Sequence, residues 1–487
     1  MLLRLEHVGP LREAEIDLSK DLIILTGPNN TGKTYLAWSV YGLHRMRFKP
    51  SGALTRWAKA LLEPPEYQID VGQLFERDQE EILGQIATDC ESQIHQCFAA
   101  ERGRFDGARI RITVSRDVIV ISSPVVTVDV DNQSGEVDPG QRLIAILYSG
   151  GPYPGQLGLA LTRGDPAALR VQLVAQVEPT VDRVKRISSS QETGELLAVA
   201  PREAIARIEG TFIIVVYRWL LHSMLPRCIL FPAERIAVNI FARELAVGRT
   251  KLVEELVDAS LEGQEEVSLA AVRSRAGSYP WPIRDSLETA NSLAQITREE
   301  TEYADLAAEI EQAVLGGKIG VSEHGGMFFS PDGAPDQRLE VHLTASVVKS
   351  LSSLVFYFRH QARKGDFLII DEPELNLHPD NQRKVARLLA KAVRRGFKIM
   401  MSTHSDYITR ELNHLVMLSK LPADEARELG YDPGCALEPK QLGVYLFNEH
   451  TAQPIPVEET GFSVQTIDDE INAMNVDAQR LYARVIG

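Results

Sequence analysis

The stretch that decides the fold is Leu22-Ile23-Ile24-Leu25 followed, after Thr26, by Gly27-Pro28-Asn29-Asn30-Thr31-Gly32-Lys33-Thr34. The apolar run predicts a short buried strand, and the polar run fits the pattern GxxxxGK[ST]. Residues Tyr35–Leu43 are suited to the helix that leads out of such a loop. Strand, glycine-rich loop and helix in this order predict a phosphate-binding loop.

The chemistry of phosphate binding explains these residue types. Glycines let backbone N–H groups curl around phosphate oxygens, and the helix N-terminus adds the positive end of its dipole. We expect Lys33 to contact the β- and γ-phosphates and the Thr34 hydroxyl to ligate Mg²⁺. The residues predicted to bind ATP are Gly27, Pro28, Asn29, Asn30, Thr31, Gly32, Lys33, Thr34 and Tyr35.

A second apolar strand, Phe367-Leu368-Ile369-Ile370, ends in Asp371-Glu372, the Walker B pattern. We expect Asp371 to hold Mg²⁺ and Glu372 to act as general base on the attacking water. Ligands of open α/β sheets bind at the carboxyl ends of the strands, where this acidic pair lies. The predicted metal ligands are therefore Thr34 and Asp371.

A third strand, Ile399-Met400-Met401, is followed by Ser402-Thr403-His404-Ser405. A histidine in this position is by itself more often structural than functional. With two matching elements already present, we predict that His404 reaches the γ-phosphate and is catalytic together with Glu372.

The run Asp371-Glu372-Pro373-Glu374-Leu375-Asn376-Leu377-His378-Pro379, with Ser402–Ser405 after it, resembles the ABC-type ATPase heads of the OLD (overcoming lysogenisation defect) and SMC/RecF-like group. Phe231-Pro232-Ala233-Glu234-Arg235 resembles a segment of the same group. The resemblance implies an α/β fold, an ABC ATPase head split in sequence into N-terminal and C-terminal lobes around a large mixed α+β insertion. It also implies ATP and Mg²⁺ as cofactors, Leu375–Pro379 as the D-loop and His404 as the switch histidine.

In this group two heads sandwich ATP, and a signature motif of one head caps the γ-phosphate bound by the other. The resemblance implies that Leu343–Leu351 is this signature, with Ser346 and Lys349 acting in trans. Val347 stands where the group usually has glycine, so slow hydrolysis is one expectation. Self-association as a dimer or higher oligomer is the other.

The long stretch of sequence between the phosphate loop and the acidic pair Asp371-Glu372 leads us to predict an insertion within the head. We expect residues 1–50 to form the N-terminal part of the head, 51–325 the insertion with helices and a small β-rich lobe around 109–150, 326–430 the C-terminal part of the head, and 431–487 a strand and helix extension. Segment 228–237 is expected to return to the head. Within the insertion the sequence predicts two or three antiparallel strands over 109–130, a loop over 139–154, helix over 286–315 and a hairpin over 316–329. Recurring glycine and proline exclude one long coiled coil in the insertion.

Composition limits the class of protein. The chain has 487 residues, is 44% hydrophobic and 24% charged, and has a formal net charge of −15. The acidic charge argues against indiscriminate nucleic-acid binding over the whole surface. The cysteines Cys90, Cys97, Cys228 and Cys435 form no CxxC pair, and the most apolar stretch, Thr211–Phe231, contains two arginines. We therefore predict a cytoplasmic protein without disulfides, a zinc ribbon or a membrane span.

A basic stripe after the acidic pair has two interpretations. Arg383, Arg387, Lys391 and Arg395 recur at helical spacing opposite apolar residues. They form either a DNA- or partner-binding ridge or, as the more frequent case, the solvated side of an amphipathic helix. Arg359, His360, Arg363 and Lys364 form a second cluster with the same alternatives.

Three functions remain open. The first is an ATPase that regulates or scaffolds a separate effector, a nuclease encoded nearby, because the resemblance extends to the ATPase subunits of antiphage systems such as PARIS and Septu and we find no nuclease motif in the chain. The second is a RecF/SMC-like repair or recombination ATPase that clamps DNA. The third is a nucleotide-gated scaffold in which hydrolysis is incidental.

Overall fold

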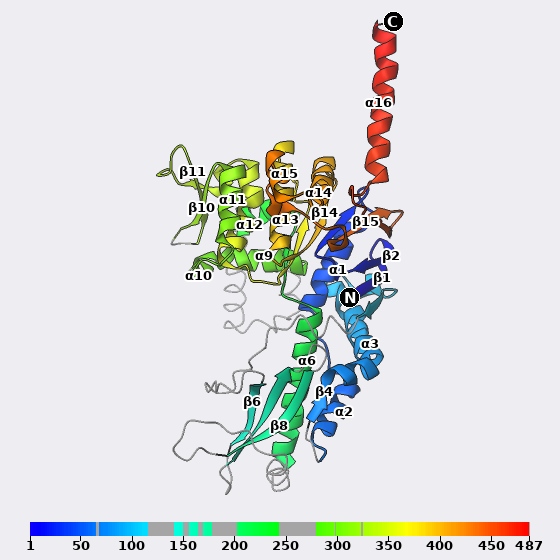
Figure 1. Ribbon diagram of the computed structural model, residues 1–487, viewed down its shortest axis with the longest axis vertical. Coiled ribbons are helices and arrows are strands. Elements are labelled where there is room, and N and C mark those ends of the chain that lie inside the picture. Colours follow the sequence, from blue (N-terminus) through cyan, green and yellow to red (C-terminus); the bar gives the residue numbers. More distant parts are fainter. Residues whose placement is uncertain are drawn as a thin grey trace, which may run out of the picture. The chain divides into compact units, whose positions relative to one another are not determined.

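The computed structural model describes residues 1–64, 68–114, 141–149, 155–163, 169–177, 202–242, 279–297, 299–322 and 325–486 (Figure 1). These residues form two compact units. The first comprises 1–3, 46–90 and 110–226, and the second comprises 4–45, 91–109 and 227–487. The predicted insertion, 51–325, differs from the first unit because segments 91–109 and 227–325 pack within the second.

The second unit contributes eight strands to a nine-stranded sheet, in the order β1-β2-β16-β15-β3-β14-β13-β9. In chain order these strands are β1 (Leu2–Val8), β2 (Leu11–Asp17), β3 (Leu22–Thr26), β9 (Cys228–Phe231), β13 (Phe367–Asp371), β14 (Lys398–Ser402), β15 (Leu442–Asn448) and β16 (Thr451–Ile455). From β15 to β9 every neighbouring pair is parallel. The three expected strands are thus β3, β13 and β14.

Every residue of β3 and β13 is buried, as expected for central parallel strands covered on both faces. The covering helices include α1 (Lys33–Arg45), α12 (Ser346–His360), α13 (Pro379–Arg394) and α14 (Asp406–Leu418). The apolar faces of α12, α13 and α14 join the strands in one hydrophobic core that includes Leu22, Val355, Leu368, Leu389 and Leu412. Burial of this apolar surface stabilises the head and fixes the strand ends that carry the site.

The remaining elements of the second unit are smaller or lie outside this sheet. They are α9 (Trp281–Asn291), α10 (Leu293–Ile296), α11 (Ala304–Ile310), the sheet of β10 (Gly317–Val321), β11 (Met327–Pro331) and β12 (Leu339–Glu340), α15 (Ala423–Glu428) and α16 (Gln465–Ile486). The helical sequence predicted over 286–315 is divided among α9, α10, α11 and a π-helical turn at Glu311–Leu315. The expected hairpin over 316–329 is formed by β10 and β11.

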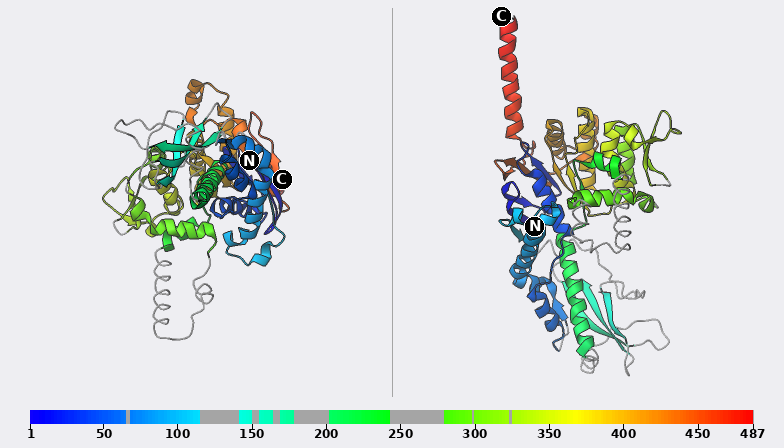
Figure 2. Two further views of the ribbon diagram at one scale, coloured as in Figure 1. Left: turned by 90° about the horizontal axis from the view of Figure 1, so that it is seen from below. Right: turned by 180° about the vertical axis from the view of Figure 1, so that it is seen from behind.

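The first unit contains an antiparallel sheet in the order β4-β8-β7-β6. Its elements are α2 (Gly52–Leu61), β4 (Gln68–Asp70), the start of α3 (Val71–Cys97), β5 (Arg109–Thr113), β6 (Gln141–Ser149), β7 (Gly155–Arg163), β8 (Leu169–Val177) and α6 (Arg202–Met224). Figure 2 shows this sheet and α6 from two further directions.

Two predictions about this unit need correction. The loop expected over 139–154 contains β6, because the apolar run around Leu143–Leu147 favours a strand despite the glycines and prolines near it. The β-rich lobe also extends to Val177, beyond the predicted end at 150. Of the strands predicted over 109–130, residues 115–130 lie outside the described part. Among the described residues, none of the helices combines the length and apolar character needed to cross a membrane.

Candidate nucleotide site

The phosphate loop joins the end of β3 to α1, and its backbone requires glycine. Gly27 and Gly32 have φ of 124° and 105°, in the left-handed region that side chains disfavour. A Cβ on Gly27 would lie 2.2 Å from the carbonyl oxygen of Phe447 in β15. The loop therefore packs so closely against the neighbouring strand that a side chain at Gly27 is excluded.

Lys33, the first residue of α1, turns back over this loop. Its Nζ donates to the carbonyl oxygens of Gly27, at 3.0 Å, and Pro28, at 2.7 Å. Burial lowers the pKa of Lys33 to about 8, although the charges of Asp371, Glu372 and Glu374 act in the opposite direction. The ammonium thus lies between the loop carbonyls and an acidic neighbourhood.

The other predicted loop residues divide by exposure. Pro28, Asn29, Asn30 and Thr34 are exposed, whereas Thr31 is buried and its hydroxyl donates to the carbonyl of Pro28 at 2.9 Å. The ring of Tyr35 stacks on Phe98, with centroids 4.7 Å apart. The exposed edge of the loop is therefore polar, while Tyr35 is held from the side by an aromatic contact.

The predicted metal ligands meet although they are 337 positions apart in the chain. The Thr34 hydroxyl lies 3.2 Å from Oδ2 of Asp371, and the Ser402 hydroxyl donates to Oδ1 of the same carboxylate. Adjacent hydroxyl and carboxylate oxygens suit Mg²⁺, which usually takes few protein ligands and completes its shell with phosphate and water. The oxygen donors present fit this ion.

Glu372 follows Asp371 in a left-handed conformation, with φ of 49°. Its N–H donates to the Ser402 hydroxyl at 3.1 Å, so β14 helps to fix the turn. Burial and the charge of Asp371 raise the pKa of Glu372, and the Lys33 cation acts against them. Strained backbone of this kind is frequent at functional sites, where surrounding bonds hold it in place.

His404 lies at the end of the neighbouring strand, β14, with an exposed side chain. Partial burial and the nearby Lys33 cation lower the pKa of His404. The imidazole is therefore neutral at pH 7, with one nitrogen able to donate a hydrogen bond. Lys33, Asp371, Glu372 and His404 all gather at the carboxyl edge of the sheet, because β3, β14 and β13 are adjacent and parallel.

Two residues of this edge received no role from the sequence. The first is Glu374, whose Oε1 accepts from the Thr403 hydroxyl at 2.9 Å and from the His404 N–H at 2.7 Å. Its Oε2 is buried and has no hydrogen-bond partner within the described part of the chain. Burial raises the pKa of Glu374. This carboxyl group ties the segment after β13 to the segment after β14.

The second is Arg235, a buried cation just after β9. Its guanidinium donates to the carbonyls of Asp371, at 2.7 Å, and Glu372, at 2.8 Å. It also donates to the carbonyl and the hydroxyl of Ser350 in α12, each at 3.1 Å. Arg235 thus joins the acidic pair to the helix that carries the predicted signature. The signal in the sequence was an arginine three positions after Pro232, the proline that follows the apolar strand β9.

The predicted signature residues lie at the beginning of α12. Ser346 is the first residue of this helix and its side chain is exposed, while Lys349 is half-buried. The Lys349 carbonyl accepts from the Asn239 amide at 2.8 Å. Val347, at the position of the missing glycine, packs against the hydrophobic core. The helix N-terminus and Ser346 are therefore open to solvent.

The basic stripe on α13 is neutralised by acids from distant parts of the chain. Arg383 and Arg387 both pair with the buried Glu411, at 2.6 and 2.5 Å. Lys391 pairs with Glu309 and Asp432, and Arg395 pairs with Asp305. The stripe is therefore the paired polar side of an amphipathic helix. Arg359 of the second cluster pairs in the same way with Glu311.

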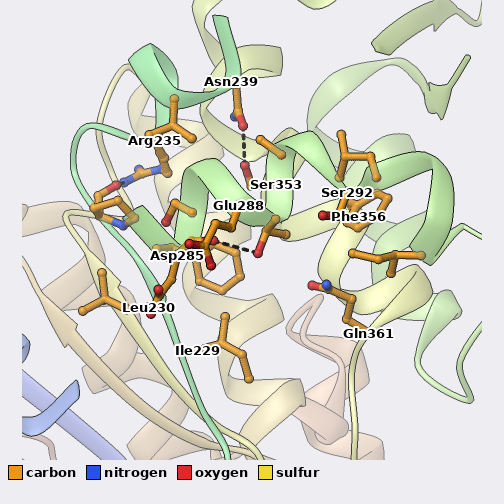
Figure 3. Close-up of a pocket in the computed structure, with 18 of the residues that line it drawn as sticks. Ile229, Leu230, Arg235, Asn239, Asp285, Glu288, Ser292, Ser353, Phe356 and Gln361 are labelled. Carbon is orange, nitrogen blue, oxygen red and sulfur yellow. Dashed lines mark hydrogen bonds between the residues drawn. The ribbon is translucent and has the colours of Figure 1, made fainter. Parts of the chain in front are cut away.

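A separate cavity of about 400 Å³ lies beside β9, α9 and α12 (Figure 3). Its apolar lining includes Ile229, Leu230 and Phe356, and the Ser353 hydroxyl donates to Asn239 at 2.7 Å on its wall. Arg235 is the residue that this cavity shares with the site described above. The phosphate loop and the acidic pair do not line it.

Comparisons with known proteins agree with a nucleotide-binding head. Residues 230–409 match the family described as AAA ATPase domain. Over 69 residues the chain is 39% identical to the cell division ATP-binding protein FtsE of Streptococcus pneumoniae, in two strains, covering 13% of this chain and 30% of that protein. The chain thus spans about a third of the length of these curated relatives.

Solved structures similar to the chain include SMC heads. One is an Smc head bound to the C-terminal winged-helix domain of ScpA, with 10% identity, a TM-score of 0.31, and coverage of 93% of this chain and 96% of that one. Another is the SMC head domain from Thermotoga maritima, with 10% identity, a TM-score of 0.28, and coverage of 94% and 98%. The chain is an α/β protein, and its region 230–409, which contributes β9, β13 and β14 to the large sheet, is similar to AAA ATPase domains.

Proposed function

We propose that this chain binds ATP with Mg²⁺ at the carboxyl edge of the large sheet and hydrolyses it in a site that a second copy completes. The observation that carries the proposal is the contact of Thr34 with Asp371 beside the buried ammonium of Lys33. Two motifs from opposite ends of the chain thereby supply a cation and oxygen ligands to one place. This is the donor set that a magnesium–triphosphate requires.

In this proposal each group has one task. Lys33 and the loop N–H groups bind the β- and γ-phosphates, and Thr34 with Asp371 holds Mg²⁺, which neutralises phosphate charge when bound. Glu372 accepts a proton from the attacking water, and its raised pKa makes it a better base than an ordinary carboxylate. The neutral His404 imidazole donates a hydrogen bond to the γ-phosphate.

The second copy supplies Ser346 and the N-terminus of α12. This surface is exposed, and a helix N-terminus with a hydroxyl suits a phosphate oxygen. ATP then joins two heads, and hydrolysis releases them. Lys349, three residues further along α12 and half-buried, contributes positive charge to the same surface.

We further propose that this ATP-dependent association acts on a separate effector protein, a nuclease encoded nearby, in a cytoplasmic antiphage system. The support is the OLD-like sequence from Asp371 to Pro379 together with the ion pairs formed by the basic stripe. Its arginines and lysine are occupied by carboxylates, which favours a protein partner over a DNA ridge on α13. A RecF/SMC-like DNA clamp is the competing function.

Glu372→Gln tests the enzymatic part. The amide keeps the shape of the side chain but cannot accept the proton, so we expect ATP to bind normally and turnover to fall at least about 100-fold. The trapped nucleotide should also shift the chain toward dimers in light scattering. Asp406→Asn, at an exposed ion pair with Arg410, is the control. Unchanged turnover in Glu372→Gln would remove this residue from the role of base.

Affinity purification tests the partner. The Glu372→Gln chain, co-expressed with its neighbouring genes, should retain a nuclease in the presence of ATP and release it in Lys33→Ala. Duplex DNA should bind weakly, with no increase on addition of ATP. Strong, salt-sensitive DNA binding that ATP increases would favour the clamp instead.

A further inference from the structure

The helix α16 carries an apolar pattern of its own. Its apolar residues recur with alternating spacings of four and three, the heptad repeat of a coiled coil. The six residues of this seam are Ile467, Ile471, Met474, Ala478, Leu481 and Val485, while Val476, Tyr482 and Ile486 lie off it. In heptad notation the a positions are Ile471, Ala478 and Val485, and the d positions are Ile467, Met474 and Leu481.

This seam is exposed in the single chain. None of the residues of α16, all of which are described, is buried. Met474 is 64% exposed, Leu481 65% and Val485 82%. Ile467, at the start of the seam, packs against the hydrophobic core of the head. Most of the stability of a helix in a protein comes from packing of its apolar face, so the exposed seam favours a partner surface.

We propose that the partner of α16 is the α16 of a second copy, in antiparallel orientation. In one antiparallel register every seam residue finds a complementary residue of the other copy. Ile467 faces Val485, Ile471 faces Leu481, and Met474 faces Ala478, with each layer repeated by symmetry. The largest seam residue, Met474, thus meets the smallest, which fills the centre of the interface evenly.

The charges flanking the seam favour antiparallel over parallel pairing. Acids gather at the start of the helix, at Asp468, Asp469 and Glu470, and the arginines Arg480 and Arg484 lie near its end. In the antiparallel register Glu470 of each copy lies opposite Arg484 of the other. A parallel pair would instead set the acidic ends side by side, which is unfavourable.

One like-charge contact remains in this register, between Asp477 and its symmetry mate at the centre. Each Asp477 already forms an ion pair with Arg480 of its own helix, at 3.5 Å. The arginine reduces the repulsion between the two carboxylates. The proposed helix pair therefore has complementary charge at both ends and a neutralised pair in the middle.

This association differs from that of the heads because it needs no nucleotide. In the full chain without ATP and with EDTA, we expect a dimer by light scattering. Leu481→Lys buries an unpaired ammonium in the seam and should raise the dimer dissociation constant at least about 100-fold. Val476→Lys, with the same charge change on the outer face of the helix, should leave the constant within about threefold. A monomeric wild-type chain, or equal effects of the two variants, would overturn the proposal.

Cysteine pairing tests the orientation. Copies with Ile471→Cys, mixed with differently tagged copies with Leu481→Cys, should form mixed disulfides and few disulfides between identical variants. Preferential 471–471 and 481–481 disulfides would establish a parallel pair and contradict the antiparallel register. The wild-type chain is the control, since Cys90, Cys97 and Cys435 are buried and Cys228 is half-buried. Repeating the experiment in Lys33→Ala separates helix pairing from nucleotide-driven association.

Discussion

The two halves of the proposed nucleotide site differ in how far one chain builds them. The half with Lys33 and Asp371 is bonded together within the head, across three adjacent strands. The half with Ser346 begins a helix whose N-terminus faces solvent. Under the proposed function, loading of nucleotide and closure of the site would be separate steps, the first performed by one copy and the second by two.

Arg235 is the physical link between these halves. It donates to the carbonyls of Asp371 and Glu372 on one side and to Ser350 of α12 on the other. A shift of α12 on closure would therefore act on the backbone that carries the proposed base. Variants can test the two halves separately: at Lys33 in the loading half, at Arg235 between the halves, and at Ser346 in the closing half.

The largest effect is expected at the loading half. Lys33→Ala removes the buried cation that faces the phosphates, and we expect ATP to bind about 1,000-fold more weakly by isothermal titration. Lys59→Ala, at an exposed lysine of α2, is the control and should change nothing. Normal binding in Lys33→Ala would show that residues 27–34 are not the phosphate loop of this protein.

The second largest effect is expected at Arg235, which links the two halves. Arg235→Gln leaves several buried carbonyls without a donor, so the free energy of unfolding in urea should fall by about 3 kcal/mol. Arg410→Gln breaks an exposed ion pair with Asp406 and should cost less than about 1 kcal/mol. Equal losses in the two variants would mean that the hydrogen bonds of Arg235 contribute no more than surface contacts do.

At the closing half we expect a variant to affect turnover and dimer formation but not ATP binding. Ser346→Arg places a bulky cation where the second head must approach, so turnover and ATP-dependent dimers should fall about 30-fold while ATP binding to single heads stays within about twofold. The control is Asn472→Arg, which introduces the same bulky cation on the outer face of α16. If Ser346→Arg hydrolyses ATP at the normal rate, the site does not close through this surface.

The smallest effect is a pH dependence of loading. The form of Lys33 that binds phosphate is the ammonium, and its pKa of about 8 means that this form is lost as the pH rises through 8. ATP should therefore bind about tenfold more weakly at pH 9 than at pH 7. Lys33→Arg stays charged, so whatever affinity it retains should be constant over this range. A flat profile for the wild-type chain would contradict the lowered pKa.

The fold class was predictable because its signals are local. Leu22–Leu25, Phe367–Ile370 and Ile399–Met401 are apolar runs that end in polar motifs, and each is a central parallel strand. The boundaries of the insertion were not predictable in the same way. Segments such as α9 and α11 have ordinary helical sequences, and contacts with distant residues decide which unit they join.

The basic stripe of α13 and the helix α16 show that the sequence does not predict what covers the face of an amphipathic helix. Both are amphipathic helices by sequence. Arg383 and Arg387 pair with Glu411, which lies on another helix, while the seam residues Met474 and Leu481 remain mostly exposed. Amphipathic spacing predicts that a face will be covered, and it does not say by what.

The sequence alone determined where the phosphate loop, the acidic pair and His404 occur, since each motif needs only a few contiguous residues after a strand. The tertiary structure decided which side chains support them: Arg235 beneath the acidic pair, Ser402 on Asp371, and Glu374 between Thr403 and His404. These contacts follow from the order and register of parallel strands. Strands hundreds of residues apart become neighbours only when the sheet assembles, so no local pattern records them.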